Sequence, residues 1–315
     1  MYNFFSSMVV SKNGEILYDI NATSHEELIE SAGLKDEEVN SNSEELAFTR
    51  IEILPKEDIF SSEPKNWYIK DLSFNRPTWF TEALEKKCLD VFFKEIYPQC
   101  VFIGKNLIFK DRKNLFLKDC STELHNSSAE LYGSSTGEVY DYSSVDVYDY
   151  SKVELWDSSK AILNNRSSVK AYYHSKAILY DSSSGEFYGS SSGELYDSSW
   201  GEFYHSSTAK FYNSSKGEVY DVVSAKLYNV SEVTFWNFSS GILNNMSSAK
   251  VYDYSKVEFY NSSSGKLYDY SSGEFYNSSS GKLYDYSKVE LYDFSLAELH
   301  DSSTATNFSQ YAKFF

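Results

Sequence analysis

An aromatic residue returns every eight positions from Tyr132 to Tyr292, except at Asn164 and Asn244, and this period restricts the fold more than any other feature of the 315-residue chain. Twenty-two units run in this register from Tyr132 to His300 without an insertion or deletion, and 17 of them carry Tyr at the aromatic position. We number the unit as small residue (one), Glu or Lys (two), apolar residue (three), Tyr (four), Asp or Asn (five), variable (six), Ser (seven) and variable (eight). Position three is apolar in all 22 units, and position seven is Ser in 21 of them.

An eight-residue period fits β-strands and not α-helices. A helix has 3.6 residues per turn, so an octad would drift by about 80° around the helix with each repeat. A strand alternates with a period of two, so positions one, three, five and seven of every unit are expected to face the same side. That side would hold the small residue, the apolar residue, Asp or Asn, and Ser, while Tyr would form rows outside.

One eight-residue strand with its corner cannot enclose a core, so stacked units must share one, as in a solenoid. The segment that begins at Trp156 returns at Trp236, an offset of ten octads. Ten octads divide into pairs but not into triplets, which favours two strands per coil over three. Lys and Glu also alternate at position two over residues 250–290, with a period of 16. Stepwise gene duplication could leave the same traces.

The sequence therefore predicts a mainly β fold, an octapeptide-repeat parallel β-solenoid with two strands in each 16-residue coil, preceded by a small α+β domain. Twenty-two units at two per coil give 11 coils. The expected domains are residues 1–104 (N-terminal α+β domain), 105–308 (β-solenoid) and 309–315 (C-terminal cap or tail). Phe308, Phe314 and Phe315 would be exposed unless the tail folds over the last coil.

The first 104 residues do not follow the octad, and their local patterns predict helices and strands. The expected elements are a hairpin through Asn13-Gly14, a helix capped by Ser24 that ends near Gly33, strands at 47–54 and 66–71, and an amphipathic helix opened by Pro77. Within the repeat, Gly at position one accompanies Phe at position three in three units, which predicts that glycine relieves crowding in the core. These pairs are Gly185 with Phe187, Gly201 with Phe203, and Gly273 with Phe275.

Charge and composition exclude several classes of function. The net charge of −17 disfavours direct binding to nucleic acid or to anionic membranes. No run of about 18 apolar residues predicts a transmembrane helix, and the N-terminus does not resemble a signal peptide. We therefore expect a cytoplasmic protein, with association to a virion left open. Cys88, Cys100 and Cys120 are an odd number without metal-ligand spacing, which favours reduced thiols.

The sequence contains no recognisable catalytic constellation. The five histidines lie in unrelated contexts, and HExxH, nucleophile-elbow and Gly-rich phosphate-loop patterns do not occur. Asp and Asn at position five could stack as metal ligands, but the corners do not have the glycine content of calcium-binding β-rolls, which favours hydrogen bonding at the corners. We expect no enzymatic activity, no cofactor and no metal.

Rows of exposed Tyr offer a large contact area at low entropic cost. The leading hypothesis is a non-catalytic scaffold that forms a homo-oligomer or binds a protein partner through coil ends or Tyr-lined faces. One alternative is a carbohydrate-binding module, and another is an acidic decoy that mimics nucleic acid for a DNA-binding protein. The candidate interaction residues are Tyr188, Tyr196, Tyr204, Tyr212, Trp156, Trp236, Asn164, Asn244, Phe314 and Phe315.

Asn164 and Asn244 replace the Tyr of their units, each eight positions after a Trp. With two octads per coil, both would lie on one face, five coils apart, while Trp156 and Trp236 would lie on the opposite face. Such gaps in a row of rings are either docking sites for a ring of another molecule or the remains of repeat decay after duplication.

The segments SHEELIESAGLKDEE and FTRIEIL, the helix with Trp79 and Phe80, and units such as SSSGEFYGSSSGELYD resemble octapeptide-repeat proteins of bacteriophages and bacteria that have no assigned activity. The resemblance covers most of the chain, and the repeat carries most of it. It implies a β-solenoid after a short N-terminal domain and a phage context, and it implies no activity.

Overall fold

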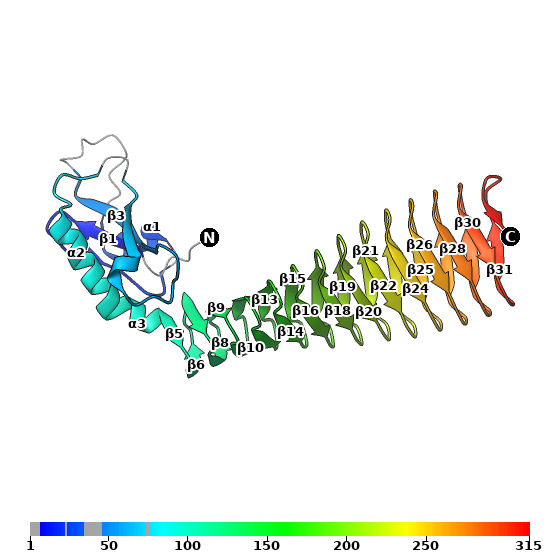
Figure 1. The fold of residues 1–315 in the computed structure, drawn as a ribbon, viewed down its shortest axis with the longest axis horizontal. Helices are drawn as coiled ribbons and strands as arrows, with labels where there is room; N and C mark the ends of the chain where they lie inside the picture. The colour runs from blue at the N-terminus through cyan, green and yellow to red at the C-terminus, as the bar shows by residue number, and fades with distance from the viewer. Residues whose placement is uncertain (1–6, 23, 35–45, 74–75) are drawn as a thin grey trace. The chain divides into compact units, whose positions relative to one another are not determined.

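The computed structural model describes residues 7–22, 24–34, 46–73 and 76–315 (Figure 1). The chain divides into two compact units. The first comprises residues 1–121 and 127–130, and the second comprises residues 122–126 and 131–315.

The first unit contains an antiparallel sheet with the strand order β2-β1-β3-β4. Its strands are β1 (Ser7–Ser11), β2 (Ile16–Leu17), β3 (Phe48–Pro55) and β4 (Trp67–Asp71). The pairing of β1 with β2 confirms the hairpin through Asn13-Gly14. Helix α1 (His25–Ser31) begins after Ser24, whose hydroxyl accepts a hydrogen bond from the Glu27 amide, and it ends before Gly33, at φ +65°. Both ends of this helix are where the sequence predicts them.

The second helix begins later than predicted. A 3₁₀ turn η2 (Pro64–Asn66) precedes β4, and the helical segment consists of α2 (Glu82–Val91), the π-helical turn η3 (Phe92–Ile96) and α3 (Tyr97–Cys100). The start at Pro77 is wrong because residues 77–80 form a separate turn, in which the Phe80 amide donates to the Pro77 carbonyl. Phe80 is buried, and the indole of Trp79 donates to the Leu46 carbonyl, so tertiary contacts hold this turn outside the helix.

Two parallel sheets of 14 strands each build the solenoid, which confirms the predicted fold class. Consecutive strands alternate between an even sheet (β6 to β32) and an odd sheet (β5 to β31), and each strand pairs with the next strand but one, as Phe187 with Phe203. The even strands are β6 (Asn106–Lys110), β8 (Ser121–His125), β10 (Thr136–Tyr140), β12 (Lys152–Leu155), β14 (Ser168–Ala171), β16 (Ser184–Phe187), β18 (Trp200–Phe203), β20 (Lys216–Val219), β22 (Glu232–Phe235), β24 (Ser248–Val251), β26 (Ser264–Leu267), β28 (Ser280–Leu283), β30 (Leu296–Leu299) and β32 (Lys313–Phe314). The odd strands are β5 (Val101–Ile103), β7 (Leu115–Lys118), β9 (Ser128–Tyr132), β11 (Ser144–Val147), β13 (Lys160–Leu163), β15 (Lys176–Leu179), β17 (Ser192–Leu195), β19 (Thr208–Phe211), β21 (Ser224–Leu227), β23 (Ser240–Leu243), β25 (Lys256–Phe259), β27 (Ser272–Phe275), β29 (Lys288–Leu291) and β31 (Thr304–Asn307).

The repeating strands run from position eight of one unit to position three of the next, for example Trp200–Phe203. Positions one and three point into the core and position two points outward, as the alternation predicts. Position seven, Ser in nearly every unit, is also buried, and several of these hydroxyls donate to the carbonyl three residues earlier, as Ser183 does to Tyr180 at 2.7 Å.

The inward orientation expected for position five is wrong. In all 22 units this residue has a positive φ, between 53° and 69°, which ends the strand alternation and turns the chain. Asn, Asp and Gly tolerate this left-handed conformation, which explains why they predominate here. Many of the side chains accept an amide N–H from the same corner of the preceding coil, as Asp253 does from Asn237 at 2.9 Å.

The glycines at position one are explained by a contact between the sheets. Six units carry Phe at position three, and in five of them a glycine stands six positions later, in the facing strand of the opposite sheet. A methyl group at Gly193 would lie 2.6 Å from Cζ of Phe187. The pairing within a unit is real but less regular, since a methyl group at Gly185 would also lie 2.7 Å from the Phe187 ring. A Phe ring therefore reaches across the core and occupies the space of a side chain on the other sheet.

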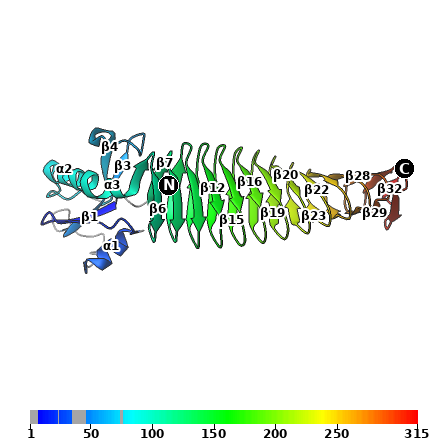
Figure 2. The same ribbon diagram turned by 90° about the horizontal axis from the view of Figure 1, so that it is seen from below.

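Figures 1 and 2 show the coils of the second unit following one another without interruption. In Figure 1 the coils broaden toward the C-terminal end, and in Figure 2, seen after a turn of 90°, they narrow toward it. The stack therefore twists about its long axis. This agrees with the twist expected of hydrogen-bonded strands. Rows of equivalent side chains therefore follow a gently winding path.

Candidate interaction surfaces

The even sheet carries an unbroken stack of rings, which we call the even ladder. Its rings stand at position four of the units, and His125 occupies the corresponding place one coil before Tyr140. Neighbouring ring centroids are 4.3–6.4 Å apart, and the rings lie within 14° of parallel. The rings are His125, Tyr140, Trp156, Tyr172, Tyr188, Tyr204, Tyr220, Trp236, Tyr252, Tyr268, Tyr284 and His300. The predicted Tyr ladder is confirmed, and it brings four candidate residues into one row: Trp156, Tyr188, Tyr204 and Trp236.

The odd sheet carries a second stack, the odd ladder, which contains Tyr196 and Tyr212 and is interrupted twice. Asn164 and Asn244 follow strands β13 and β23 and both lie on this side of the solenoid, as the 16-residue coil requires. They divide the odd ladder into runs of two, four and four rings. The runs are Tyr132 with Tyr148, then Tyr180, Tyr196, Tyr212 and Tyr228, then Tyr260, Tyr276, Tyr292 and Phe308.

Many ladder hydroxyls donate to the Glu two residues earlier on the same strand. Tyr140 donates to Glu138 at 2.6 Å, and Tyr260 donates to Glu258 at 2.8 Å. These hydrogen bonds, together with burial, raise the pKa of each of these two Tyr side chains to about 12, because ionisation would place a second negative charge beside the carboxylate. Burial followed by the bond to Glu194 raises the pKa of Tyr196 to about 12 as well.

The ladders are expected to make the fold sensitive to alkali. The pKa values of Tyr140, Tyr196 and Tyr260 lie above the value of about 10 for Tyr in an unfolded chain, so the folded state retains protons that the unfolded state releases. Their contribution to stability is therefore complete below about pH 10 and is lost as the pH rises from about 10 to about 12. Urea unfolding at increasing pH, with tyrosinate absorbance at 295 nm, measures this. If every Tyr titrates near pH 10 while the far-ultraviolet circular dichroism stays constant, the prediction is wrong.

A row of exposed apolar side chains follows the corner after the even strands, and the sequence reasoning did not find it. It occupies position six of five successive coils, and its members are 56–65% exposed. We call it the corner ridge; it consists of Val222, Phe238, Tyr254, Tyr270 and Tyr286. Its four rings stack at 5.4 Å. The signal is present in the sequence as a 16-residue period at position six, where Tyr254, Tyr270 and Tyr286 alternate with Ser.

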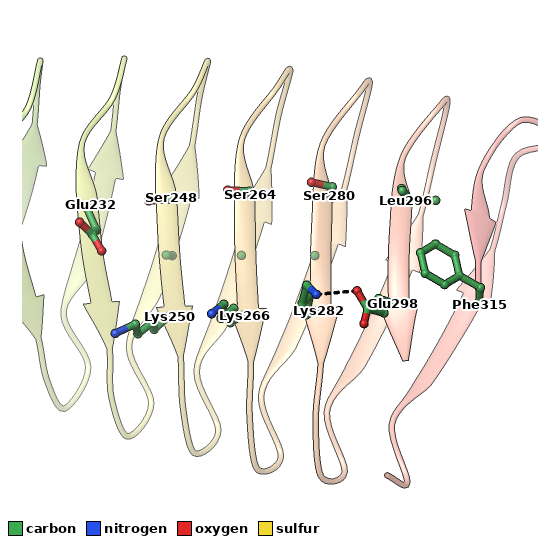
Figure 3. A pocket seen from close by; sticks show the side chains of 13 residues that line it. Glu232, Ser248, Lys250, Ser264, Lys266, Ser280, Lys282, Leu296, Glu298 and Phe315 are labelled. Atoms are coloured by element: carbon green, nitrogen blue, oxygen red, sulfur yellow. Dashed lines mark ion pairs between the residues drawn. The ribbon is translucent and has the colours of Figure 1, made fainter. Parts of the chain in front are cut away.

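The outer side of the even sheet, the even face, is hollowed near its C-terminal end (Figure 3). The groove has a volume of about 420 Å³ and is lined by a row of Lys at position two beside a row of Ser at position eight. The Lys residues are Lys250, Lys266 and Lys282, and the Ser residues are Ser248, Ser264 and Ser280. Lys282 pairs with Glu298 at 2.7 Å. The alternating Lys and Glu of residues 250–290 are thus separated by face, with Lys on the even sheet and Glu on the odd sheet.

The outer side of the odd sheet has a groove of about 480 Å³ near Asn164. Ile162 and Ile178 line it with Lys160, and Asp146 lies at one end. Burial raises the pKa of Asp146. Both units that carry Asn at position four have Ile at position two, where most other units have a charged residue.

Phe314 and Phe315 lie at the C-terminal end of the stack. Strand β32 pairs with β30, but one extra residue in the corner places Phe314 opposite Ala297, an offset of 17 instead of 16. The amide of Leu299 donates to the Phe315 carbonyl at 2.8 Å. Both Phe rings are exposed, at 49% and 69%. The tail therefore extends the even sheet and leaves its aromatic side chains accessible.

Among the described residues, no group of three or more His, Cys, Asp or Glu is arranged to hold a metal ion. Burial raises the pKa of the thiols of Cys88 and Cys100 to about 12, so neither is a reactive thiolate near neutral pH. Within the same part of the chain, no helix is long and apolar enough to cross a membrane. Comparison with protein-family models, with curated proteins and with solved structures finds no match.

Proposed function

We propose that the chain is a non-catalytic scaffold that assembles with copies of itself. The observation that carries this proposal is the corner ridge, an uninterrupted row of exposed apolar side chains over five coils. Contiguous exposed apolar surface of this kind is characteristic of protein interaction sites. The resemblance of the units to octapeptide-repeat proteins of phages and bacteria supports an assembly in the cytoplasm or on a virion.

The fold does not need these rings. Position six is Ser in many other units, including Ser262 and Ser278 between the ridge residues in the sequence. Because the side chain at this position lies outside both the core and the ladders, its identity is free to serve an interaction. A row of large apolar residues at such a position therefore supports a role in binding.

Replacing the four ring residues by Ser tests the proposal. We expect the variant Phe238→Ser, Tyr254→Ser, Tyr270→Ser and Tyr286→Ser to lose assemblies seen for the wild type in sedimentation velocity, while its circular dichroism spectrum shows that the solenoid remains folded. Tyr142→Ser with Tyr150→Ser is the matched control, since these two Tyr side chains are exposed but belong to no row. If the ridge variant assembles as well as the wild type, the corner ridge is not the assembly surface.

Carbohydrate binding is a second candidate, and the gaps in the odd ladder favour it. Within each run, a ladder ring covers the facing sides of its neighbours, so a sugar cannot stack between them. At Asn164 the rings of Tyr148 and Tyr180 are two coils, or about 10 Å, apart, and each turns one face toward the gap. A flat ring would fit between them at about 5 Å from each, which is the ladder spacing. Asn244 leaves the same slot between Tyr228 and Tyr260.

Closing both slots tests this second candidate. The variant Asn164→Tyr with Asn244→Tyr is expected to lose glycan binding measured on an array, and to gain roughly 1 kcal/mol in unfolding free energy per added ring from aromatic stacking. Ser262→Tyr adds a ring without closing a slot and serves as the control. Higher stability with unchanged glycan binding would favour repeat decay as the origin of the gaps.

The acidic-decoy hypothesis has less support than these two. Lys250, Lys266 and Lys282 form a basic row on the even face, which a mimic of nucleic acid would not present to a DNA-binding protein.

A further inference from the structure

The charges at position two of the even face are antisymmetric about Thr234. The residue one coil before Thr234 and the residue one coil after it carry opposite charges. The same is true at two, three and four coils from Thr234. In order along the face, the row reads Lys170, Glu186, Glu202, Glu218, Thr234, Lys250, Lys266, Lys282 and Glu298. These residues pair register with register across the even sheet, so each lies one coil from the next.

We propose that two copies of the chain pair even face to even face, with their stacks antiparallel, about a two-fold axis that runs along strand β22 through Thr234. A two-fold interface brings a surface against itself. This axis reverses the order of the coils and keeps the direction of the strands, so each position of the unit faces the same position of the second copy. Every charge of the row then lies opposite its complement: Lys170 with Glu298, Glu186 with Lys282, Glu202 with Lys266, and Glu218 with Lys250. This inference rests on the proposed self-assembly and specifies its geometry.

The same axis places large side chains at position eight over small ones. Trp200, which is 38% exposed, comes to lie over Ser264, and Lys216 comes to lie over Ser248. Both Ser residues belong to the row that lines the groove in Figure 3. Glu232 meets its own copy on the axis, and its charge is already paired with Lys216 at 3.0 Å. The groove of each copy therefore receives the bulky residues of the other.

Apolar residues mark the axis at both edges of the face. Strand β22 lies between two corners whose position-six residues are Val230 and Phe238, exposed at 48% and 65%. In the proposed pair, each of them meets its own copy. At the Phe238 edge, Val222 also comes opposite Tyr254, so three members of the corner ridge enter the interface. The charge row and the apolar edges therefore share one centre, and the groove of each copy lies on one side of it.

The size of the face suits a reversible dimer. Residues 170–298 span eight coil steps, or about 38 Å, and a four-residue strand is about 13 Å wide, which gives roughly 500 Å² per copy. A total of about 1000 Å² is the lower limit for a specific interface. Exposed ion pairs contribute little affinity but set register and orientation, so the charge row would select the antiparallel arrangement. Because the stack twists, the two copies would wind about each other, and the pairs nearest Thr234 would be the closest.

The odd face does not have this property over the same length. About Ile242 it shows two complementary pairs, Lys226 with Glu258 and Lys210 with Glu274. The next pair would bring Glu194 against Glu290, which repel each other. The odd face is therefore the natural comparison in an experiment.

Charge reversal with complementation tests the proposal. The variant Glu186→Lys, Glu202→Lys, Glu218→Lys and the reciprocal variant Lys250→Glu, Lys266→Glu, Lys282→Glu should each raise the dimer dissociation constant at least about tenfold, measured by sedimentation equilibrium. An equimolar mixture of the two should restore a one-to-one dimer, because the central rows of the two variants carry opposite charges.

In the mixed pair, each all-Lys row of one variant faces the all-Glu row of the other, so all six central contacts join opposite charges. Each exchange introduces a residue that other units carry at position two, so folding is preserved, as melting temperatures would verify. The matched control Glu258→Lys, Glu274→Lys, Glu290→Lys changes the net charge equally on the odd face and should still dimerise.

Orientation is tested by cross-linking with a short bismaleimide. Glu202→Cys and Lys266→Cys, each in a separate chain, should cross-link in the mixture and not alone, because position 202 of one copy faces position 266 of the other, whereas the two copies of position 202 are four coils, or about 19 Å, apart along the stacks. The native Cys88, Cys100 and Cys120 are buried and do not compete. Cross-linking of the Glu202→Cys variant with itself would indicate a parallel pair and overturn the proposal.

The remaining outcomes separate this inference from the proposed function. If the wild type associates and neither charge-reversal variant associates more weakly, the scaffold function stands and the even-face dimer is wrong. If only the odd-face variant loses association, the even-face dimer is wrong and the odd face is the interface. A wild type that is monomeric at every concentration and at low salt would overturn self-assembly itself.

Discussion

The substitution Gly193→Ala is expected to lower the free energy of unfolding by about 1–3 kcal/mol, the usual cost of overpacking a core. A methyl group at this position would lie 2.6 Å from Cζ of Phe187 and 2.8 Å from Cζ of Phe203. These two rings are stacked at 4.3 Å and fully buried, so neither can move aside without displacing its neighbours. Chemical denaturation monitored by circular dichroism measures the loss.

The matched control is Gly137→Ala, at the same position of a unit that follows Leu131 instead of Phe. There the methyl group would lie 3.1 Å from Cδ2 of Leu131, a flexible side-chain end, and alanine also reduces the entropy of the unfolded chain. We expect little change or a small gain in stability. Combining Gly193→Ala with Phe187→Leu should cost less than the sum of the two single changes. Strict additivity would show that ring and glycine do not share the same space.

The substitution Asp253→Val is expected to destabilise the protein by about 2–3 kcal/mol, the sum of a backbone cost and a lost hydrogen bond. Asp253 has a φ of +58°, a conformation that costs about 1–2 kcal/mol for residues other than Gly, Asn and Asp, and a β-branched side chain is especially unfavourable there. The change also removes the carboxylate that accepts the Asn237 amide at 2.9 Å, which adds roughly 1 kcal/mol. Equilibrium unfolding in urea measures the sum.

Asp253→Asn is the control, because Asn tolerates the same backbone conformation and presents an oxygen to the Asn237 amide. Most corners of the solenoid carry one of these two residues, and the control should be close to wild type in stability. The reverse experiment is Tyr173→Asn, which replaces a Tyr held at a φ of +56° and should raise stability. A Val variant as stable as the Asn variant would mean that the corner conformation does not select its residue type.

The N-terminal region shows where local patterns suffice and where they fail. The hairpin at Asn13-Gly14 and the helix behind Ser24 were predictable because turn chemistry and capping are properties of a few adjacent residues. The start of α2 was not, since the turn at 77–80 is held by the burial of Phe80 and by the bond from Trp79 to Leu46, a residue far away in the sequence.

The candidate site shows the same division. The ladders that contain Tyr188 and Tyr196 were predictable from the octad alone. The corner ridge and the charge row were not found, although every residue of both is visible in the sequence. Their meaning depends on which side of the solenoid each unit occupies, and a row becomes a surface only when equivalent residues of alternate units are placed one coil apart.

The sequence by itself determined the strand period, the 16-residue coil, the buried and exposed positions of each strand and the stacking of Tyr. These follow from an even period and from translation along the stack, which act identically on every unit. Only the tertiary structure decided the left-handed corner at position five and the pairing of Phe187 with Gly193 across the core. Each of these depends on contacts between different strands, where the size of a ring or the hydrogen bond of a neighbouring coil overrides the alternation within one strand.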